Sequence, residues 1–328
     1  MREYDLIAVL EGRHPFAPAP NLQMPELQTI IQNGLTAVLS AIPRPPLRPA
    51  PSVAQQLQNG ARQLALQTAC MDMAPLLPVR LDTAVTLAGA KRLLMANQPF
   101  LDQLLTRYAG LAQVQIMASW QDAGLPTRFA NEAARTDPRA QSLPWSPDPT
   151  AATRTSAKQQ VSQQISSMIS ARLATVVTQI APLALTPGLV WSGIVLVPLQ
   201  RLRDLTRALD QVSALWPEGL QIRQIGPDPV TAFATIDVVQ VTACQIETAL
   251  KAFWLHPAAD HGQLAAARRR RLDEASRLHN PALRAAISHQ AEILTAAARL
   301  NLPNHGFALC RIRTDHNTRV QPPDRAVA

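Results

Sequence analysis

The chain has 328 residues, of which 47% are apolar, so it can form one large or two medium domains with buried cores, and a disordered chain is excluded. Lys and Arg outnumber Asp and Glu by 31 to 23, which gives a formal net charge of +8. A surplus of that size over this length affects solubility and general attraction to anions, and it does not specify a function.

Residues 1–124 are predicted to form an α+β domain, because strand and helix patterns alternate there. The strand candidates are short apolar runs at 4–10, 35–42, 76–85 and 114–120, and the Pro-rich run 43–51 is expected at the surface. Ser52 can cap a helix whose apolar stripe would be Val53, Leu57, Ala61, Leu64 and Thr68. A second helix, at 94–108, should bend or restart near Pro99, which has no N–H to donate.

Residues 125–156 are predicted to be a linker, since prolines lie there among polar residues without periodicity. A helix follows, in which large side chains recur at three- and four-residue spacing: Val161, Ile165, Met168, Arg172, Val176 and Ile180. No Asp or Glu occurs between Asp148 and Asp204, so the exposed surface of this helix should be neutral to basic.

Residues 157–314 are predicted to form a second domain that is ferredoxin-like. After the helix, the patterns indicate strands at 189–197, 220–225, 231–239 and 306–312, with helices at 199–215 and at about 244–300. This is the order β-α-β-β-α-β with an enlarged second helical element. Breaks are expected near Pro257 and Pro281, and residues 315–328 are expected to form a flexible tail.

Three features bear on location. Residues 173–200 carry no charge, but Gln, Pro and Gly interrupt them, so we interpret them as a helix end, a turn and a buried strand, and expect no membrane span. The beginning of the chain lacks the basic-then-apolar form of a secretory signal. Cys70, Cys244 and Cys310 are isolated from one another, as is typical of proteins in a reducing cytoplasm.

Strong catalytic motifs are absent from the sequence: there is no Gly-rich phosphate loop, no G-x-S-x-G and no H-E-x-x-H. Six of the seven histidines lie at or after His256, but they form no i, i+4 pair and no compact pattern with cysteine. We therefore expect no enzyme activity, no cofactor and no metal site.

The sharpest charge cluster is the run of four arginines at 268–271. Such a run can bind phosphate, but consecutive side chains on a helix point in all directions around it. Asp273 and Glu274 each lie four residues after an arginine of the run, namely Arg269 and Arg270, and can pair with it. We interpret the run as a solvated helix surface rather than a nucleic-acid site.

Two stretches, in this order, resemble the gas vesicle accessory protein F/L family. The first is Leu77-Pro78-Val79-Arg80-Leu81-Asp82-Thr83, against Leu-Pro-Met/Val-Arg-Phe-Gly-Thr in the family. The second is Gly226-Pro227-Asp228-Pro229-Val230-Thr231-Ala232-Phe233, against Gly-Pro-Trp-Pro-Pro-Tyr-Ser-Phe, and is read as the turn and start of a β-hairpin. The matching positions, together with a Trp that ends a strand, are expected to be mainly structural: Pro78, Arg80, Thr83, Trp120, Gly226, Pro227, Pro229 and Phe233. The departures indicate a divergent member.

The resemblance implies an accessory role in gas vesicle assembly in the cytoplasm. The expected partners are the small hydrophobic shell protein and other gas vesicle accessory proteins, and the expected role is to aid shell nucleation or growth. Such binding needs an apolar groove or an open sheet edge, not catalytic groups. We hypothesise that the sheet of the second domain and the acid-free helix form this surface, with Val161, Ile165, Met168 and Arg172 as candidates.

Two other classes stay open on the sequence alone. A ferredoxin-like domain can belong to a ligand-binding protein or an enzyme, which a convergent polar pocket with shifted pKa values would favour. A basic RNA-binding module would need exposed aromatic side chains on strands, for which Trp191 and Phe233 are the candidates.

Overall fold

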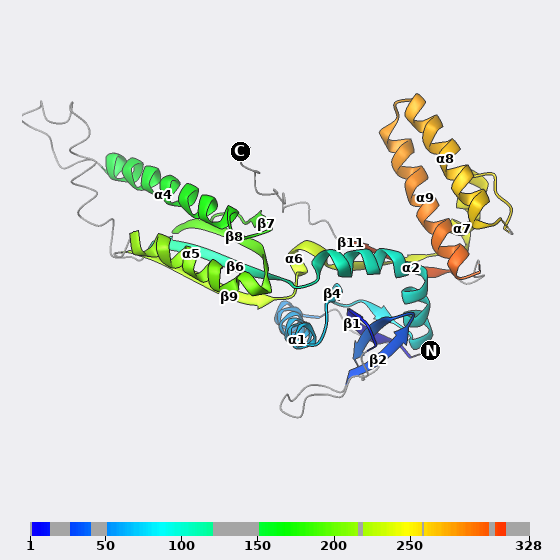
Figure 1. Ribbon diagram of the computed structural model, residues 1–328, viewed down its shortest axis with the longest axis horizontal. Helices are drawn as coiled ribbons and strands as arrows, with labels where there is room; N and C mark the ends of the chain where they lie inside the picture. The colour runs from blue at the N-terminus through cyan, green and yellow to red at the C-terminus, as the bar shows by residue number, and fades with distance from the viewer. Residues whose placement is uncertain are drawn as a thin grey trace, which may run out of the picture. The chain divides into compact units, whose positions relative to one another are not determined.

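The computed structural model describes residues 2–13, 27–40, 51–120, 151–215, 219–257, 259–301 and 306–312, and the chain divides into two units (Figure 1). Unit 1 comprises residues 1–109 and 234–313, and the described part of unit 2 lies within residues 110–233. The expected linker up to residue 150, most of the Pro-rich run and the expected tail lie outside the described residues.

Unit 1 begins with an antiparallel sheet. Its strands are β1 (Tyr4–Glu11), β2 (Leu27–Gln32), β3 (Leu35–Ser40), β4 (Leu76–Pro78) and β5 (Ala84–Val85), in the order β2-β3-β1-β4, with β5 also paired to β1. The sequence did not lead us to predict β2. It forms a hairpin with β3 through Asn33 and Gly34, whose φ angles of 52° and 80° are those that a two-residue primed turn requires.

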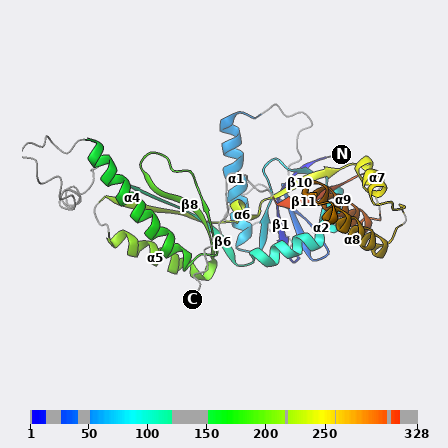
Figure 2. The same ribbon diagram turned by 90° about the horizontal axis from the view of Figure 1, so that it is seen from above.

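Two helices, α1 (Val53–Met71) and α2 (Leu87–Tyr108), contact β1 and β4. Figure 2 shows both helices near β1. Ser52 caps α1 as predicted, because its Oγ accepts a hydrogen bond from the N–H of Gln55. The predicted apolar stripe of α1 was wrong: Val53 and Leu57 are 73% and 70% exposed. The buried face instead carries Gln63, Leu66, Gln67 and Cys70. α2 contains Pro99 and has a bend in Figure 1.

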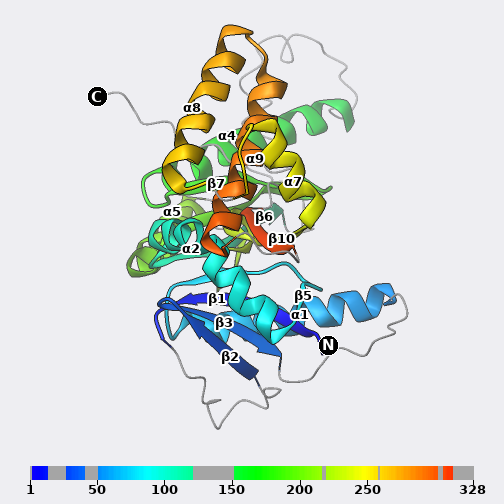
Figure 3. The same cartoon turned by 90° about the vertical axis from the view of Figure 1, so that its right-hand side faces the viewer.

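The C-terminal part of unit 1 pairs two strands and adds three helices. β10 (Ile236–Val241) and β11 (Phe307–Ile312) are antiparallel, and α7 (Ala243–Ala252), α8 (His261–Arg277) and α9 (Pro281–Arg299) lie between them in sequence. Thr242, Asp260 and Asn280 cap these helices, so the helical region and both of its breaks occur where the sequence predicts them. Figure 3 shows these three helices together, and Phe253, which is 1% exposed, lies in their hydrophobic core.

Unit 2 is a four-stranded antiparallel sheet with two helices packed on it. The strand order is β7 (Gln179–Pro182), β8 (Leu189–Pro198), β6 (Leu111–Trp120) and β9 (Leu220–Asp228). A short 3₁₀ turn, η1 (Leu199–Arg201), precedes the second helix. α4 (Ala151–Ala174) and α5 (Leu202–Leu215) contact each other and β8. Alternate residues of β6 are buried, so one face of this sheet forms the core with both helices.

The predicted β-α-β-β-α-β set within residues 189–312 is not formed. β8 and β9 belong to unit 2, whereas β10 and β11 pair with each other in unit 1. The same order of elements occurs earlier in the chain, as β6-α4-β7-β8-α5-β9, because β6 pairs with β8 and β9 instead of the strands of the expected first domain. The chain therefore passes between units at 109–110 and 233–234, and not near residue 124.

The boundaries of α4 also differ from the prediction. The helix begins at Ala151, within the expected linker, and ends at Ala174. Ile180, predicted to lie on the helix, is in β7. The spacing of the apolar residues continues beyond residue 174, so periodicity alone could not reveal where the helix ends.

Candidate functional site

The first family stretch begins in β4 and connects two parts of unit 1 that are far apart in the sequence. Pro78 pairs with β1, and Val79 makes a parallel bridge to Ile236. The Arg80 N–H donates to the Ile236 carbonyl at 2.9 Å, and the Arg80 guanidinium lies 3.4 Å from the Asp237 carboxylate. The Arg80 side chain is 52% exposed, so this ion pair contributes little stability, and the backbone bond fixes the position of the strand.

A turn interrupts the strand predicted at 76–85, which is divided into β4 and β5. Thr83 Oγ1 donates to the Arg80 carbonyl at 2.8 Å, and the Thr83 carbonyl accepts the Leu6 N–H. Asp82 has a φ of 66°, in the left-handed region. The family pattern has Gly at this position, and Asp is one of the few other residues that tolerate this conformation. The departure therefore preserves the turn.

Two buried amides that we did not predict connect α1 to this stretch and to β1. Gln63 Nε2 donates to the Val79 carbonyl at 2.6 Å, and Gln67 Nε2 donates to the Ile7 carbonyl at 2.8 Å. Gln63 and Gln67 are 8% and 3% exposed. Two glutamines one helical turn apart, on the face that also carries Leu66 and Cys70, are the sequence signal for this arrangement.

Trp120 and a second tryptophan hold α4 on the sheet of unit 2. Trp120, at the end of β6, donates from Nε1 to Ser162 Oγ at 3.1 Å. Trp191 of β8 donates to Ser170 Oγ, also at 3.1 Å. Because both serines lie on α4, these two bonds fix the position of the helix along the sheet.

Replacing Ser170 with alanine should lower the free energy of unfolding by about 1 kcal/mol, because the Trp191 N–H loses its acceptor. Ser167, on the exposed side of the same helix, provides the matched control, and Ser167→Ala should change stability by no more than about 0.5 kcal/mol. Urea denaturation followed by tryptophan fluorescence measures both. Equal effects would show that the indole bond does not stabilise unit 2.

The helix face that we predicted to bind a partner packs on its own sheet. Ile165 is fully buried in the core of unit 2, and Val161 and Met168 are partly buried against that core. Arg172 is exposed. The predicted partner surface is therefore corrected: burial within the unit explains the apolar spacing of this helix.

The second family stretch lies at the end of β9 and is not the turn of a β-hairpin, because β9 pairs with β6 and β10 pairs with β11. The Gly226–Pro227 peptide bond is cis, and the φ of Gly226 is 117°. A Cβ atom at Gly226 would lie 2.9 Å from the Gln113 carbonyl oxygen of β6. Glycine is required here for both its φ angle and this close approach.

The chain beyond β9 is held by Gln113 as well. Its Nε2 donates to Thr231 Oγ1 and its Oε1 accepts the N–H of Ala232, both at 2.8 Å. The Pro229 carbonyl accepts the Thr231 N–H, and Phe233 lies in the short helix α6 (Thr231–Ala234) with 7% exposure. The matching residues of this stretch thus lie in a strand end and a helical turn.

On α8, the arginine run has different partners from those predicted. Arg271 pairs with Glu274, and its guanidinium lies 5.0 Å from the centroid of the Trp254 ring. The other three arginines of the run are exposed. The predicted i, i+4 pairs are not formed among the described residues; the ion pair that forms has i, i+3 spacing.

Among the groups with shifted pKa values are two buried cysteines and the partly buried His289, which contacts Arg311. Burial raises the pKa of Cys70 to about 11 and also raises that of Cys310, so both thiols are protonated and unreactive at neutral pH. Burial and the neighbouring Arg311 lower the pKa of His289. In the described ranges, no group of three His, Cys, Asp or Glu residues could hold a metal ion.

No helix in the part of the chain that the structure describes is long and apolar enough to cross a membrane. Together, these residues define an α+β protein whose recognisable sequence stretches form strand ends and turns. The chain belongs to the gas vesicle synthesis protein GvpL/GvpF family, whose model matches residues 11–235.

A solved structure of the gas vesicle protein GvpF, from Anabaena sp. PCC7120, shows the same fold. It is 14% identical, with 70% of this chain and 97% of that chain covered and a TM-score of 0.51. The structure of GvpF from Microcystis aeruginosa has the same identity and coverage and a TM-score of 0.49. No curated protein matches the chain. The family match ends before β10, so α7, α8 and α9 lie beyond it.

Proposed function

We propose that this chain binds the hydrophobic gas vesicle shell protein in the cytoplasm and aids shell nucleation or growth together with other gas vesicle accessory proteins. Family membership supports the role in gas vesicle synthesis. The observation that carries the binding step is an exposed apolar pair on α1, formed by Val53 and Leu57, which are 73% and 70% exposed. The pair lies within the residues that the family model matches.

The setting of this α1 pair suits an apolar partner. Residues 52–58 are all exposed, and α1 carries no charged side chain before Arg62, so this half of the helix offers no ion pair to an acidic or basic partner. Gln63 and Gln67 fix the second half of the helix to unit 1, which gives the exposed half a defined direction. Large apolar side chains at i and i+4 are the typical anchors of helix-mediated docking.

Substituting both Val53 and Leu57 by Gln should abolish or strongly weaken the complex, because burying a large apolar side chain contributes about 1.5–3 kcal/mol. The measurement is co-expression of the tagged chain with the shell protein, followed by pull-down.

The control is the Ala54→Gln/Gln58→Ala double variant, which alters a neighbouring exposed pair with the same i, i+4 spacing and should retain the complex. Absence of a wild-type complex would refute shell-protein binding. Equal retention by both double variants would refute the α1 pair as its site.

The burial of the two candidate aromatic residues gives little support to RNA binding. Trp191 and Phe233, the two candidates, are 6% and 7% exposed, so neither ring offers a face on which a base could stack.

A further inference from the structure

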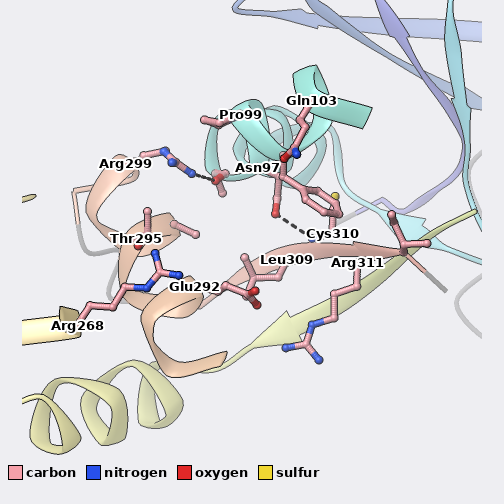
Figure 4. A pocket seen from close by; sticks show the side chains of 14 residues that line it. Asn97, Pro99, Gln103, Arg268, Glu292, Thr295, Arg299, Leu309, Cys310 and Arg311 are labelled. Carbon is pink, nitrogen blue, oxygen red and sulfur yellow. Dashed lines mark hydrogen bonds between the residues drawn. The ribbon is translucent and has the colours of Figure 1, made fainter. Parts of the chain in front are cut away.

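A cavity of about 560 Å³ lies in unit 1, where α2 and α9 meet β11 and where α8 contributes Arg268 (Figure 4). Most of its polar residues come from the segment after residue 235, beyond the family match. The volume falls in the range of about 300–1,000 Å³ that is usual for small-molecule sites. None of the family stretches contributes to it.

The walls of the cavity are fixed by hydrogen bonds between its elements. Asn97 on α2 donates from Nδ2 to the Ala308 carbonyl at 2.9 Å and accepts the Cys310 N–H at 2.8 Å through Oδ1. Arg299 on α9 donates to the Ala96 carbonyl at 3.0 Å. These bonds hold α2 to both β11 and α9, so the cavity is largely preformed.

Positive charge predominates around the cavity, since three arginines and a single glutamate line it. Arg299 donates to a neutral carbonyl, and Arg311 donates to His289, whose lowered pKa keeps it neutral. Arg268 is exposed and has no ion pair or hydrogen bond within the described ranges. Glu292 compensates one of the three arginine charges, so a surplus of about two positive charges remains at this site.

Between these charges the lining is apolar, with Pro99, Phe100, Ala296 and Leu309 contributing to it. We propose that the cavity binds a small organic anion: an apolar body in contact with these four residues, with one carboxylate, phosphate or sulfonate group held by Arg268. Charge-assisted hydrogen bonds from arginine to such groups are among the stronger polar interactions in proteins. Of the four arginines in the run, Arg268 is the one that lines this cavity.

The test uses isothermal titration calorimetry on the full chain with 1-naphthoate and octanoate, and with 1-naphthamide and inorganic phosphate as probes that lack the charge or the apolar body. Arg268→Gln should weaken 1-naphthoate binding about tenfold, the effect of losing one charge-assisted hydrogen bond. Arg269→Gln, an exposed neighbour outside the cavity, is the matched control and should bind as the wild type does.

Gln103→Trp gives a second, independent reading, because Gln103 is exposed and lines the cavity, so a bulky side chain there should block entry without disturbing the core. Absence of wild-type binding by both carboxylates at millimolar concentration would overturn the proposal. So would equal weakening by Arg268→Gln and Arg269→Gln, or phosphate or naphthamide binding as tightly as naphthoate.

Discussion

Replacing Asn97 with alanine should lower the stability of unit 1 by about 3–5 kcal/mol. The side chain is 4% exposed and makes three hydrogen bonds, to Leu93 on its own helix and to Ala308 and Cys310 on β11. Alanine would leave a carbonyl and an N–H of β11 buried without their present partner. The cost of an unsatisfied buried group exceeds the net value of the bond that it loses, which is why the expected effect is large.

Hydrogen–deuterium exchange gives a local measurement of this effect, since peptides covering residues 307–312 should lose protection in the Asn97→Ala variant. Chemical denaturation gives the overall loss of stability. Asp102→Ala, on the exposed side of α2, is the control and should leave β11 protected. If both variants exchange alike, Asn97 does not hold β11 in place.

Gly226→Ala should destabilise unit 2 by about 2–4 kcal/mol. Alanine is strained at a φ of 117°, and its Cβ would approach the Gln113 carbonyl oxygen at 2.9 Å, so β9 must move away from β6. Gly188 separates the two causes, because its φ is 91° but a Cβ atom there would meet nothing within 4 Å. Gly188→Ala should therefore cost only the conformational strain.

Fluorescence of Trp120 and Trp191, which both lie in unit 2, reports the unfolding of these glycine variants in urea. The larger loss is expected for Gly226→Ala. If the two variants lose equal stability, the close approach of residue 226 to β6 does not contribute to the destabilisation by Gly226→Ala.

Local patterns predicted most elements because each depends on nearby residues. The capping residue Ser52, and the prolines at the helix breaks, act within a few positions of themselves. The missed hairpin of β2 and β3 had a signal as well, since Asn33-Gly34 between apolar runs is a strong two-residue turn pattern. The error on α1 had another cause: apolar spacing placed Val53 and Leu57 in the core, but the helix is buried only in its second half, where two glutamine amides satisfy backbone carbonyls.

Pairing between distant strands could not be read from the sequence. The alternation in β6 shows that one face is buried, but it does not identify the neighbouring strands, so β6 was assigned to the wrong sheet. The same limit applies to the family stretches. Their positions were visible, but the partner of Arg80 is 157 residues away in sequence, and Gly226 contacts a strand that precedes it by more than a hundred positions.

The interrupted sequence of unit 1 has a consequence for synthesis on the ribosome. The described residues of unit 2 all fall within 110–233, with no segment of unit 1 between them, so their strands and helices are all available as soon as β9 has emerged. Unit 1 is interrupted by unit 2 in the sequence. Asn97 can form its hydrogen bond with Cys310 only after a further 213 residues have been synthesised. During that interval α2 exposes the surface that β11 and α9 later cover, and an uncovered apolar surface of this kind favours aggregation of the nascent chain.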